Sequence, residues 1–196
     1  MRTRNTDKEA LVKEKAIELL VQQGFDGFSM NKLAKASGIS VATLYIYYQD
    51  KDDLIKKIGI ELGEGFFKGA LKNFSPDMAF AEGLRLQWDN RIAYSTANKK
   101  AMQCWEALRH SPHNEYIVQH AKANLREVLG KFIQNAIANG QLVQLPFEVY
   151  WSIAYGPLYT LLKFDSEGKS VGGSPFKLTE EIKEAAFKSV IKALTP

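Results

Sequence analysis

The stretch of sequence that decides the fold reads GFDGFSMNKLAKASGISVATLYIYYQDKDDL and runs from residue 24 to residue 54. Gly24 stands where a glycine typically ends a helix, and Ser29 and Ser40 are typical N-cap residues for two short helices. Only a few residues around Gly38 separate these two helices. This spacing predicts a helix-turn-helix, in which the second helix of the pair enters the major groove of DNA.

The helix predicted over residues 41–48 has an inward and an outward face. Leu44 and Tyr48 lie four residues apart and are expected to face the core. The outward face is rich in Val, Ile and Tyr, whose exposure is costly in water and requires a partner. Thymine methyl groups and phosphate oxygens suit this surface, although packing on another helix of the chain stays open. The outward residues are Val41, Ala42, Thr43, Tyr45, Ile46 and Tyr47.

The rest of the chain continues in helical patterns. Its apolar residues recur at helical spacing, which predicts an all-α fold of about nine helices. We expect a small domain over residues 1–50 and a larger helical domain over residues 51–196. The apolar stripe of residues 117–136 predicts one long helix, and the Gly- and Ser-rich residues 165–177 predict a loop.

Two further helices are predicted near the end of the sequence. Residues 148–164 are apolar nearly all round, which indicates burial on several sides, and Gly156-Pro157 is expected to kink or interrupt this helix. Thr179 is the expected N-cap of a last helix over residues 179–194. These two helices are the candidate dimer interface.

Composition narrows the class of protein without deciding it. The 196 residues carry a net charge of +4, and residues 1–57 (10 basic, 8 acidic) and 58–196 (16 basic, 14 acidic) each contribute +2. Charge alone therefore does not indicate nucleic-acid binding. The single Cys104 excludes an internal disulfide and favours a reducing, cytoplasmic location. No apolar run is long enough to predict a membrane span.

The helix that follows Asp50 contains four glycines, each of which costs a helix interior about 1 kcal/mol relative to Ala. Two explanations stay open. The helix bends or slides when a ligand binds, or the small residues let a neighbouring helix approach closely. The glycines are Gly59, Gly63, Gly65 and Gly69.

The second half of the chain is rich in aromatic residues. Core packing explains most such stripes, and an aromatic-lined ligand cavity is the functional alternative. The candidate ligand-binding residues are Trp88, Met102, Trp105, Tyr155 and Tyr159. This lining favours a flat or hydrophobic molecule. Asp89 or Glu106 is a possible partner for a cationic group, with surface solvation as the alternative.

No catalytic or cofactor motif is present, so we expect neither an enzyme nor a bound cofactor. His110, His113 and His120 lack a metal-ligand spacing and have no Cys or His pair to complete them. Cys104 lies beside Trp105 on an apolar helix, where a free cysteine is usually a small buried hydrophobe.

Three motifs within residues 7–58 resemble the TetR (tetracycline-repressor) family. They are the run from Gly24 to Ala34, the segment Ser37-Gly38-Ile39-Ser40 with Thr43-Leu44-Tyr45-Ile46-Tyr47-Tyr48, and Lys51-Asp52-Asp53-Leu54. Beyond residue 58 only length, helix count and helix order are similar. The resemblance implies a homodimeric regulator that binds a palindromic DNA operator through the N-terminal domain. It also implies that a small-molecule effector enters the C-terminal ligand-binding and dimerisation domain.

The resemblance also assigns roles to individual residues. It implies that Thr43 and Tyr47 contact phosphates and that Tyr45 reaches a base edge or a phosphate. It also places Lys51 at a phosphate near a helix N-terminus. The resemblance further implies that the N-terminus of the second helix faces DNA backbone phosphates. The residues at this N-terminus are Ser29, Asn31 and Lys32.

The chain departs from the family at the start of the recognition helix. Many relatives carry Lys, Arg or Gln there, whereas this chain has Val41 and Ala42. No residue of this helix makes a bidentate hydrogen-bond pair with a base, so methyl contacts and DNA shape must supply specificity. Arg2 and Arg4 are either a minor-groove arm or a disordered terminus.

The sequence thus predicts a ligand-responsive transcriptional repressor that a small hydrophobic or aromatic molecule releases from DNA. The alternative is a helical adaptor that uses an inherited helix-turn-helix scaffold to bind protein. A steep salt dependence of DNA binding distinguishes the two.

Overall fold

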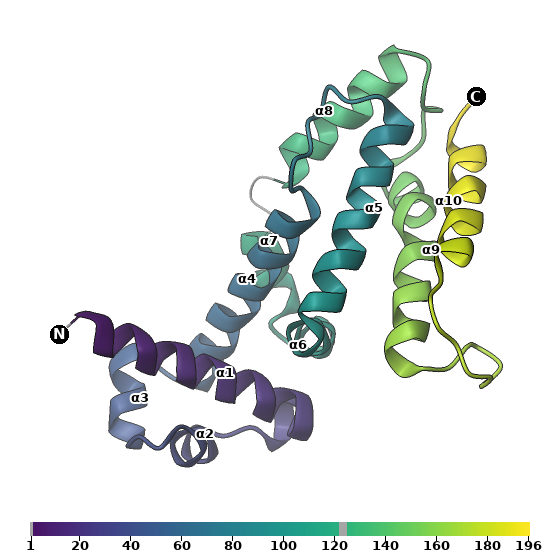
Figure 1. The fold of residues 1–196 in the computed structure, drawn as a ribbon. Coiled ribbons are helices and arrows are strands. Elements are labelled where there is room, and N and C mark those ends of the chain that lie inside the picture. Colours follow the sequence, from purple (N-terminus) through teal and green to yellow (C-terminus); the bar gives the residue numbers. More distant parts are fainter. Residues whose placement is uncertain (1, 122–124) are drawn as a thin grey trace. The chain divides into compact units, whose positions relative to one another are not determined.

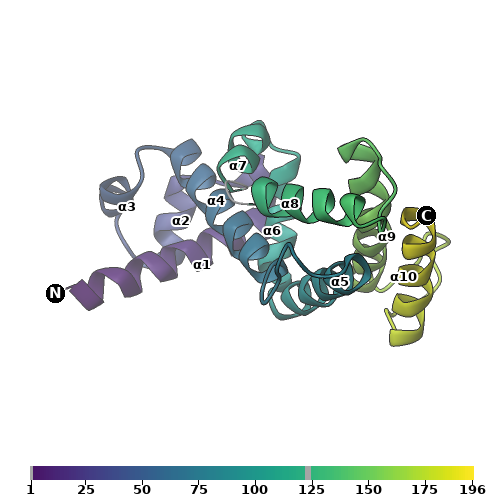
Figure 2. The same cartoon turned by 90° about the horizontal axis from the view of Figure 1, so that it is seen from above.

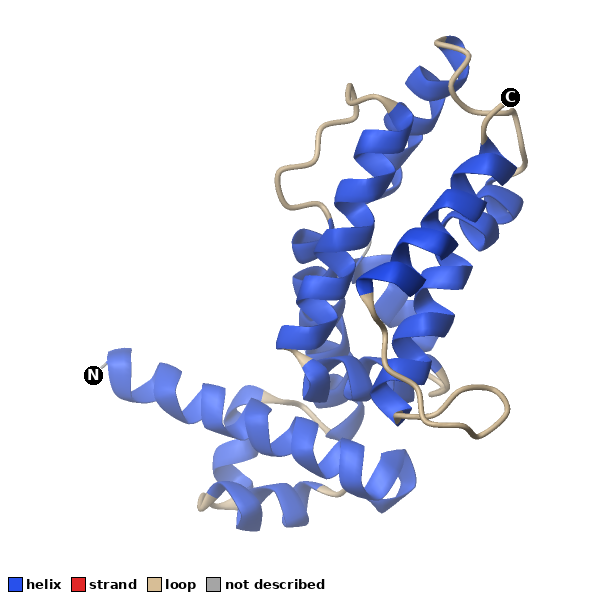
Figure 3. Cartoon of the chain, turned by 45° about the vertical axis from the view of Figure 1, so that its right-hand side comes forward, coloured by secondary structure: helices blue, strands red, loops and turns tan. Residues whose placement is uncertain are grey.

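The computed structural model describes residues 2–121 and 125–196, which form ten helices and no strand (Figures 1 and 3). The predicted all-α class is confirmed. One helix is added to the nine predicted, because residues 117–136 are described as two helices on either side of residues 122–124. The helices are α1 (Arg2–Gly27), α2 (Met30–Ser37), α3 (Val41–Tyr47), α4 (Lys51–Ala70), α5 (Phe80–Ala97), α6 (Lys99–Arg109), α7 (Asn114–Ala121), α8 (Leu125–Ala138), α9 (Phe147–Glu167) and α10 (Glu180–Leu194).

The chain forms two compact units. The first unit contains residues 1–67 and 98–123, and the second unit contains residues 68–97 and 124–196. The first unit therefore holds α1 to α3, most of α4, and α6 with α7. The second holds α5 and α8 to α10. The functional division expected near residue 50 stays a prediction.

In the first unit, α1 buries an apolar stripe at helical spacing. Val12, Ala16 and Leu20 are each at most 2% exposed, and α1 packs against α2 and α6. Gly24 has φ 67° and ψ −176°, so a kink interrupts the helical conformation three residues before α1 ends. This confirms the helix-breaking role expected of Gly24, because a positive φ is accessible to glycine at little cost.

Two of the four glycines of α4, Gly59 and Gly63, pack against other helices of the first unit. A Cβ atom built on Gly59 lies 2.5 Å from Ile117 Cδ1, and one built on Gly63 lies 2.6 Å from Ala121 Cβ and 2.7 Å from the Trp105 ring. Both glycines are buried. Close approach of α6 and α7 therefore accounts for Gly59 and Gly63 without a hinge.

The second unit has an aromatic core from α5, α8, α9 and α10. Trp88 and Phe132 are fully buried, and Trp88 packs edge-on against Phe187 with the ring centroids 5.3 Å apart. The indole N–H of Trp88 donates a hydrogen bond to the carbonyl oxygen of Ala154 (2.8 Å). A buried indole N–H requires a hydrogen-bond partner, and here the partner lies on another helix. The hydrogen bond therefore joins α5 to α9.

α9 and α10 pack side by side (Figures 1 and 2). α9 runs without interruption from Phe147 to Glu167 with Pro157 inside it, so the interruption that was one of the two expectations at Gly156-Pro157 is wrong, and the kink stays a prediction. The proline removes one backbone N–H, and Thr160 Oγ1 donates a hydrogen bond to the Gly156 carbonyl (3.0 Å). The predicted loop is correspondingly shorter and begins after Glu167.

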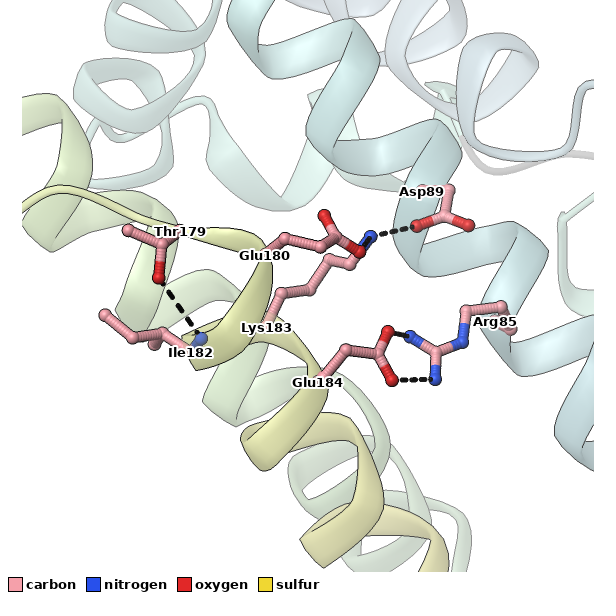
Figure 4. Close-up of polar contacts among 7 residues, drawn as sticks. All are labelled: Arg85, Asp89, Thr179, Glu180, Ile182, Lys183 and Glu184. Atoms are coloured by element: carbon pink, nitrogen blue, oxygen red, sulfur yellow. Dashed lines mark hydrogen bonds and ion pairs between the residues drawn. The ribbon is translucent and has the colours of Figure 1, made fainter.

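Charged side chains join α10 to α5 (Figure 4). Arg85 and Glu184 form two parallel hydrogen bonds, and Lys183 Nζ lies 3.0 Å from Asp89 Oδ1. Thr179 caps α10 as predicted, because its hydroxyl accepts a hydrogen bond from the Ile182 N–H. The bidentate Arg85–Glu184 pair sets the orientation of α10 as well as contributing energy.

Gly63→Ala is expected to destabilise the protein by about 1–3 kcal/mol, since its Cβ overlaps Ala121 and Trp105. Gly130→Ala in α8 is the matched control, because a Cβ there meets no atom within 4 Å. Its expected effect is a gain of about 0.5–1 kcal/mol from helix propensity. Urea unfolding measures both. A stabilising Gly63→Ala variant would show that close packing does not require this glycine.

Candidate nucleic-acid interface

The turn between α2 and α3 has a capped, left-handed geometry. Gly38 has φ 65° and ψ 29°, and the Ile39 N–H donates to the Ala34 carbonyl (3.1 Å). At the other end of α2, Ser29 Oγ accepts a hydrogen bond from the Lys32 N–H (3.3 Å). Both caps are those that the sequence predicts, and together they set the direction in which the chain enters α3.

α3 begins with a second serine cap. Ser40 Oγ accepts from the Thr43 N–H (3.1 Å) and lies 2.8 Å from Thr43 Oγ1. On the inward face, Leu44 is fully buried and Tyr48 is 6% exposed. These two anchors fix the rotation of α3, so its remaining side chains point away from the core as predicted.

The outward face of α3 exposes large apolar groups. Ile46 is 78% exposed and Tyr45 is 52% exposed. Ala42 is also exposed, whereas Val41, Thr43 and Tyr47 are half-buried. The sequence left open whether these residues pack on another helix of the chain. The large exposed fractions of Ile46 and Tyr45 exclude such packing for these two residues.

Reciprocal caps hold the junction between α3 and α4. The Asp53 N–H donates to Asp50 Oδ1 (2.8 Å), and the Gln49 N–H donates to Asp53 Oδ2 (2.9 Å). Lys57 Nζ contacts both Asp53 Oδ2 (3.0 Å) and the Tyr47 carbonyl (3.2 Å). Desolvation raises the pKa of Asp53, but the Gln49 N–H and Lys57 outweigh it and lower that pKa. Lys57 was not among the predicted site residues, although its i,i+4 spacing from Asp53 is a usable signal.

Two lysines expected at DNA phosphates also hold the end of α1. Lys32 Nζ donates to Gln23 Oε1 and to the Gly27 carbonyl, both at 2.8 Å. Lys51 Nζ donates to the Phe25 carbonyl (2.9 Å) and lies 4.5 Å from the centre of the Phe25 ring. This structural role was not predicted. Their phosphate contacts, and that of the exposed Asn31, stay predictions.

The backbone of Arg2 and Arg4 is helical, because α1 begins at Arg2. Neither residue therefore forms an extended arm ahead of the first helix. Their side chains lie outside the described residues.

A histidine links α7 to the start of α4 within the first unit. His113 Nε2 lies 3.3 Å from Asp52 Oδ1, and its ring centroid lies 5.5 Å from that of Phe25. The other two histidines lie elsewhere: His110 beside Glu106 and His120 stacked on Tyr116. Residues 2–121 and 125–196 contain no group of three acidic, His or Cys side chains placed to hold a metal ion.

Cys104 is fully buried in the first unit. Burial raises the pKa of its thiol to about 12. The thiol is therefore protonated and unreactive at neutral pH, as expected of a small buried hydrophobe.

The candidate ligand-binding residues fall into both compact units. Trp88 and Tyr155 are fully buried and Tyr159 is half-buried in the second unit, whereas Met102 and Trp105 belong to α6 of the first unit. Neither unit therefore contains all five. The two acidic candidates already have cationic neighbours: Asp89 has Lys183, and Glu106 has Arg109.

The second unit also buries two polar residues that the sequence analysis missed. Gln87 and Arg91 are fully buried one turn apart on α5. Their signal in the sequence was weak, because Phe80, Leu84, Trp88 and Ile92 recur every four residues and mark the apolar face, and Gln87 and Arg91 each stand one residue before a member of this set. Only the packing of α9 against α5 shows that they face inward.

None of the helices in the described part of the chain is long and apolar enough to cross a membrane.

Comparison with known proteins agrees with this geometry. Residues 12–58 match the family model for bacterial regulatory proteins of the tetR family. An HTH-type transcriptional regulator of Haemophilus influenzae is 25% identical over 194 residues, which cover 99% of each chain. A Staphylococcus aureus HTH-type transcriptional regulator is 30% identical over 108 residues, 55% of this chain and 58% of that protein.

Solved structures extend the similarity over the whole fold. A TetR family transcription regulator from Marinobacter aquaeolei superposes with a TM-score of 0.82 at 27% identity, covering 99% of this chain and 98% of that one. A TetR-family regulator from Haemophilus influenzae shares the fold, with a TM-score of 0.77 at 23% identity and coverage of 98% and 99%. The capped helix-turn-helix, its family match and these relatives place the chain among regulators rather than enzymes. Residues 12–58 thus form a DNA-binding domain of the tetR family, and the chain is a transcriptional regulator with a helix-turn-helix DNA-binding domain.

Proposed function

We propose that this regulator is a homodimeric repressor that binds a palindromic operator and releases it when a small molecule binds. The observation that carries the DNA-binding part is the exposed apolar face of α3, with Ile46 78% exposed on a helix capped at both ends. A rigid helix with an exposed face of this kind suits the major groove.

The chemistry of α3 limits how it reads DNA. Ile46 and Ala42 offer methyl contacts to thymine, and the Tyr45 hydroxyl is a donor and acceptor for a base edge or a phosphate. Thr43 and Tyr47 are proposed phosphate contacts. Specificity then depends on thymine positions and on DNA shape rather than on bidentate pairs with guanine or adenine.

Ile46→Ala is expected to weaken specific DNA binding about five- to twentyfold, because a buried apolar contact with a base is worth about 1–2 kcal/mol. The control is Val171→Ala, a substitution at a residue that is 92% exposed in the loop before α10 and should leave affinity unchanged. Fluorescence anisotropy on the DNA upstream of the protein's own gene measures both, with excess nonspecific competitor at two salt concentrations.

The same titration decides between a regulator and an adaptor. Saturable binding that weakens steeply with salt and with Ile46→Ala supports the regulator. Salt-insensitive or absent binding to every duplex tested would contradict it and favour the protein-binding adaptor.

The outward faces of α9 and α10 support a dimer formed through residues 148–164 and 179–194. Small side chains recur there every four residues, which lets the helices of a second copy approach closely. A Cβ built on Gly156 meets no atom within 4 Å. Pairing two copies through these helices gives a two-fold assembly with two α3 helices for two operator half-sites. The small residues are Ser152, Gly156 and Thr160 on α9 and Ala185, Ser189 and Ala193 on α10.

Ala185→Arg is expected to convert the dimer into a monomer, because a long charged side chain prevents close approach and would be buried without a partner. Ala138→Arg, at the exposed last residue of α8, is the matched control and should stay dimeric. Sedimentation velocity measures both. A dimeric Ala185→Arg variant would exclude this face of α10 from the interface.

For the effector, we propose a site in the second unit near Trp88, Tyr155 and Tyr159. These residues combine a large aromatic surface with hydroxyl groups, the usual composition of a small-molecule site. Binding there would alter the packing of α5 on α9.

A further inference from the structure

α5 buries a charged side chain in the aromatic core of the second unit. Arg91 is fully buried, and so is Gln87 one turn earlier. Arginine keeps its positive charge at any accessible pH. A buried cation is costly unless an opposite charge or a full set of hydrogen bonds compensates it.

Every acceptor that Arg91 contacts is neutral. Its Nε donates to Tyr159 OH (3.1 Å), and its Nη1 donates to the Gln87 backbone carbonyl (3.2 Å) and to Gln87 Oε1 (3.4 Å). The guanidinium carbon lies 4.3 Å from the centre of the Tyr155 ring. Among the ion pairs of the described residues, none involves Arg91. Its charge is thus held by dipoles and a ring face only.

Two buried N–H groups of this cluster have no acceptor. Arg91 Nη2 and Gln87 Nε2 are both buried without a hydrogen-bond partner. The orientation of the Gln87 amide follows from its neighbours, since Arg91 can only donate and Tyr155 OH donates to the same Oε1 (2.7 Å). Burial raises the pKa of Tyr155, so its hydroxyl stays protonated and keeps that role. The unpartnered atoms are therefore both donors.

The nearby carboxylates do not supply the missing charge. Asp89, on the same helix, lies 3.0 Å from Lys183, and Glu184 of α10 pairs with Arg85 (Figure 4). Each of these carboxylates already has its own cation. No carboxylate of the described residues is paired with Arg91, so a bound carboxylate is a candidate for the missing partner.

We propose that Arg91 and Gln87 form the anion-binding end of the effector site, and that the effector is a small carboxylic acid with an apolar body. A carboxylate accepts hydrogen bonds from charged and neutral donors alike, so it would satisfy the two free donors, and it supplies the missing negative charge. The aromatic rings of Tyr155 and Trp88 suit the apolar body. This inference rests on the proposed ligand response, because it names the class of effector.

The burial of the cluster gives a route from binding to structural change. Arg91 and Gln87 have no exposed surface, and Tyr155 and Tyr159 of α9 cover the guanidinium. An acid can reach them only if α9 moves away from α5. Binding would thus break the Arg91–Tyr159 hydrogen bond or the Arg91–Tyr155 contact.

The test compares acids with their neutral amides on the full-length protein. Benzoate, phenylacetate and octanoate are paired with benzamide, phenylacetamide and octanamide at equal ionic strength. The acid that fits is expected to raise the Tm by about 5–10 °C at a hundredfold excess over its Kd, and its amide should not. Equal shifts for acid and amide, or no shift with any of the three acids, would overturn the proposal.

Arg91→Met tests the residue itself, because it removes the charge and keeps most of the volume. The shift produced by the acid should disappear in this variant and persist in Arg126→Met, whose arginine is exposed on α8. An acid response retained by Arg91→Met would also overturn the proposal. If Arg91→Met does not fold, the comparison of acids with amides on the unaltered protein still shows whether the protein binds a carboxylate.

DNA anisotropy in parallel separates this inference from the proposed function. An acid that stabilises the protein through Arg91 but leaves DNA affinity unchanged supports the binding site and contradicts its role as an effector site. DNA binding that responds only to neutral compounds leaves the ligand-responsive repressor standing and refutes the carboxylate site.

Discussion

The turn around Gly38 is the constraint on which the DNA-binding surface depends. With φ at 65°, Gly38 adopts a conformation that costs other L-residues roughly 1 kcal/mol, and it lets the Ile39 N–H reach back to Ala34. The Ser40 cap follows two residues later, so α3 begins at a defined point. Leu44 then fixes its rotation. A different turn would change the direction of α3 and with it the exposure of Tyr45 and Ile46.

The lysines near α3 differ in their role from those of a typical basic DNA-binding surface. Lys32 and Lys51 each donate to a backbone carbonyl at the end of α1, and Lys57 donates to a backbone carbonyl of α3. Part of the basic character is therefore used to hold α1 and α3 in place. The exposed surface of α3 is apolar instead, which is why we propose DNA shape and methyl contacts as the main source of its specificity.

In the second unit a cationic side chain, Arg91, is buried among aromatic rings, whereas in the first unit apolar side chains of α3 are exposed. The hydrogen bond from Trp88 to Ala154 joins α5 to α9, and both helices contribute to the hydrophobic core that contains Phe132. A buried guanidinium without an anionic partner is costly to the folded protein. The carboxylate ligand that we propose would lower this cost by bringing the opposite charge.

The sequence alone determined the features that depend on near neighbours in the chain. Caps at Ser29, Ser40 and Thr179, the break at Gly24 and the inward face of α3 follow from local hydrogen bonds and helical periodicity, which act over a few residues. Tertiary structure decided the rest. Gly63 is required by the Trp105 side chain about forty residues away, Lys51 reaches Phe25, and Arg91 becomes an unpaired buried charge only when α9 covers it. These outcomes depend on which helices meet, and helical periodicity in a single sequence does not contain that information.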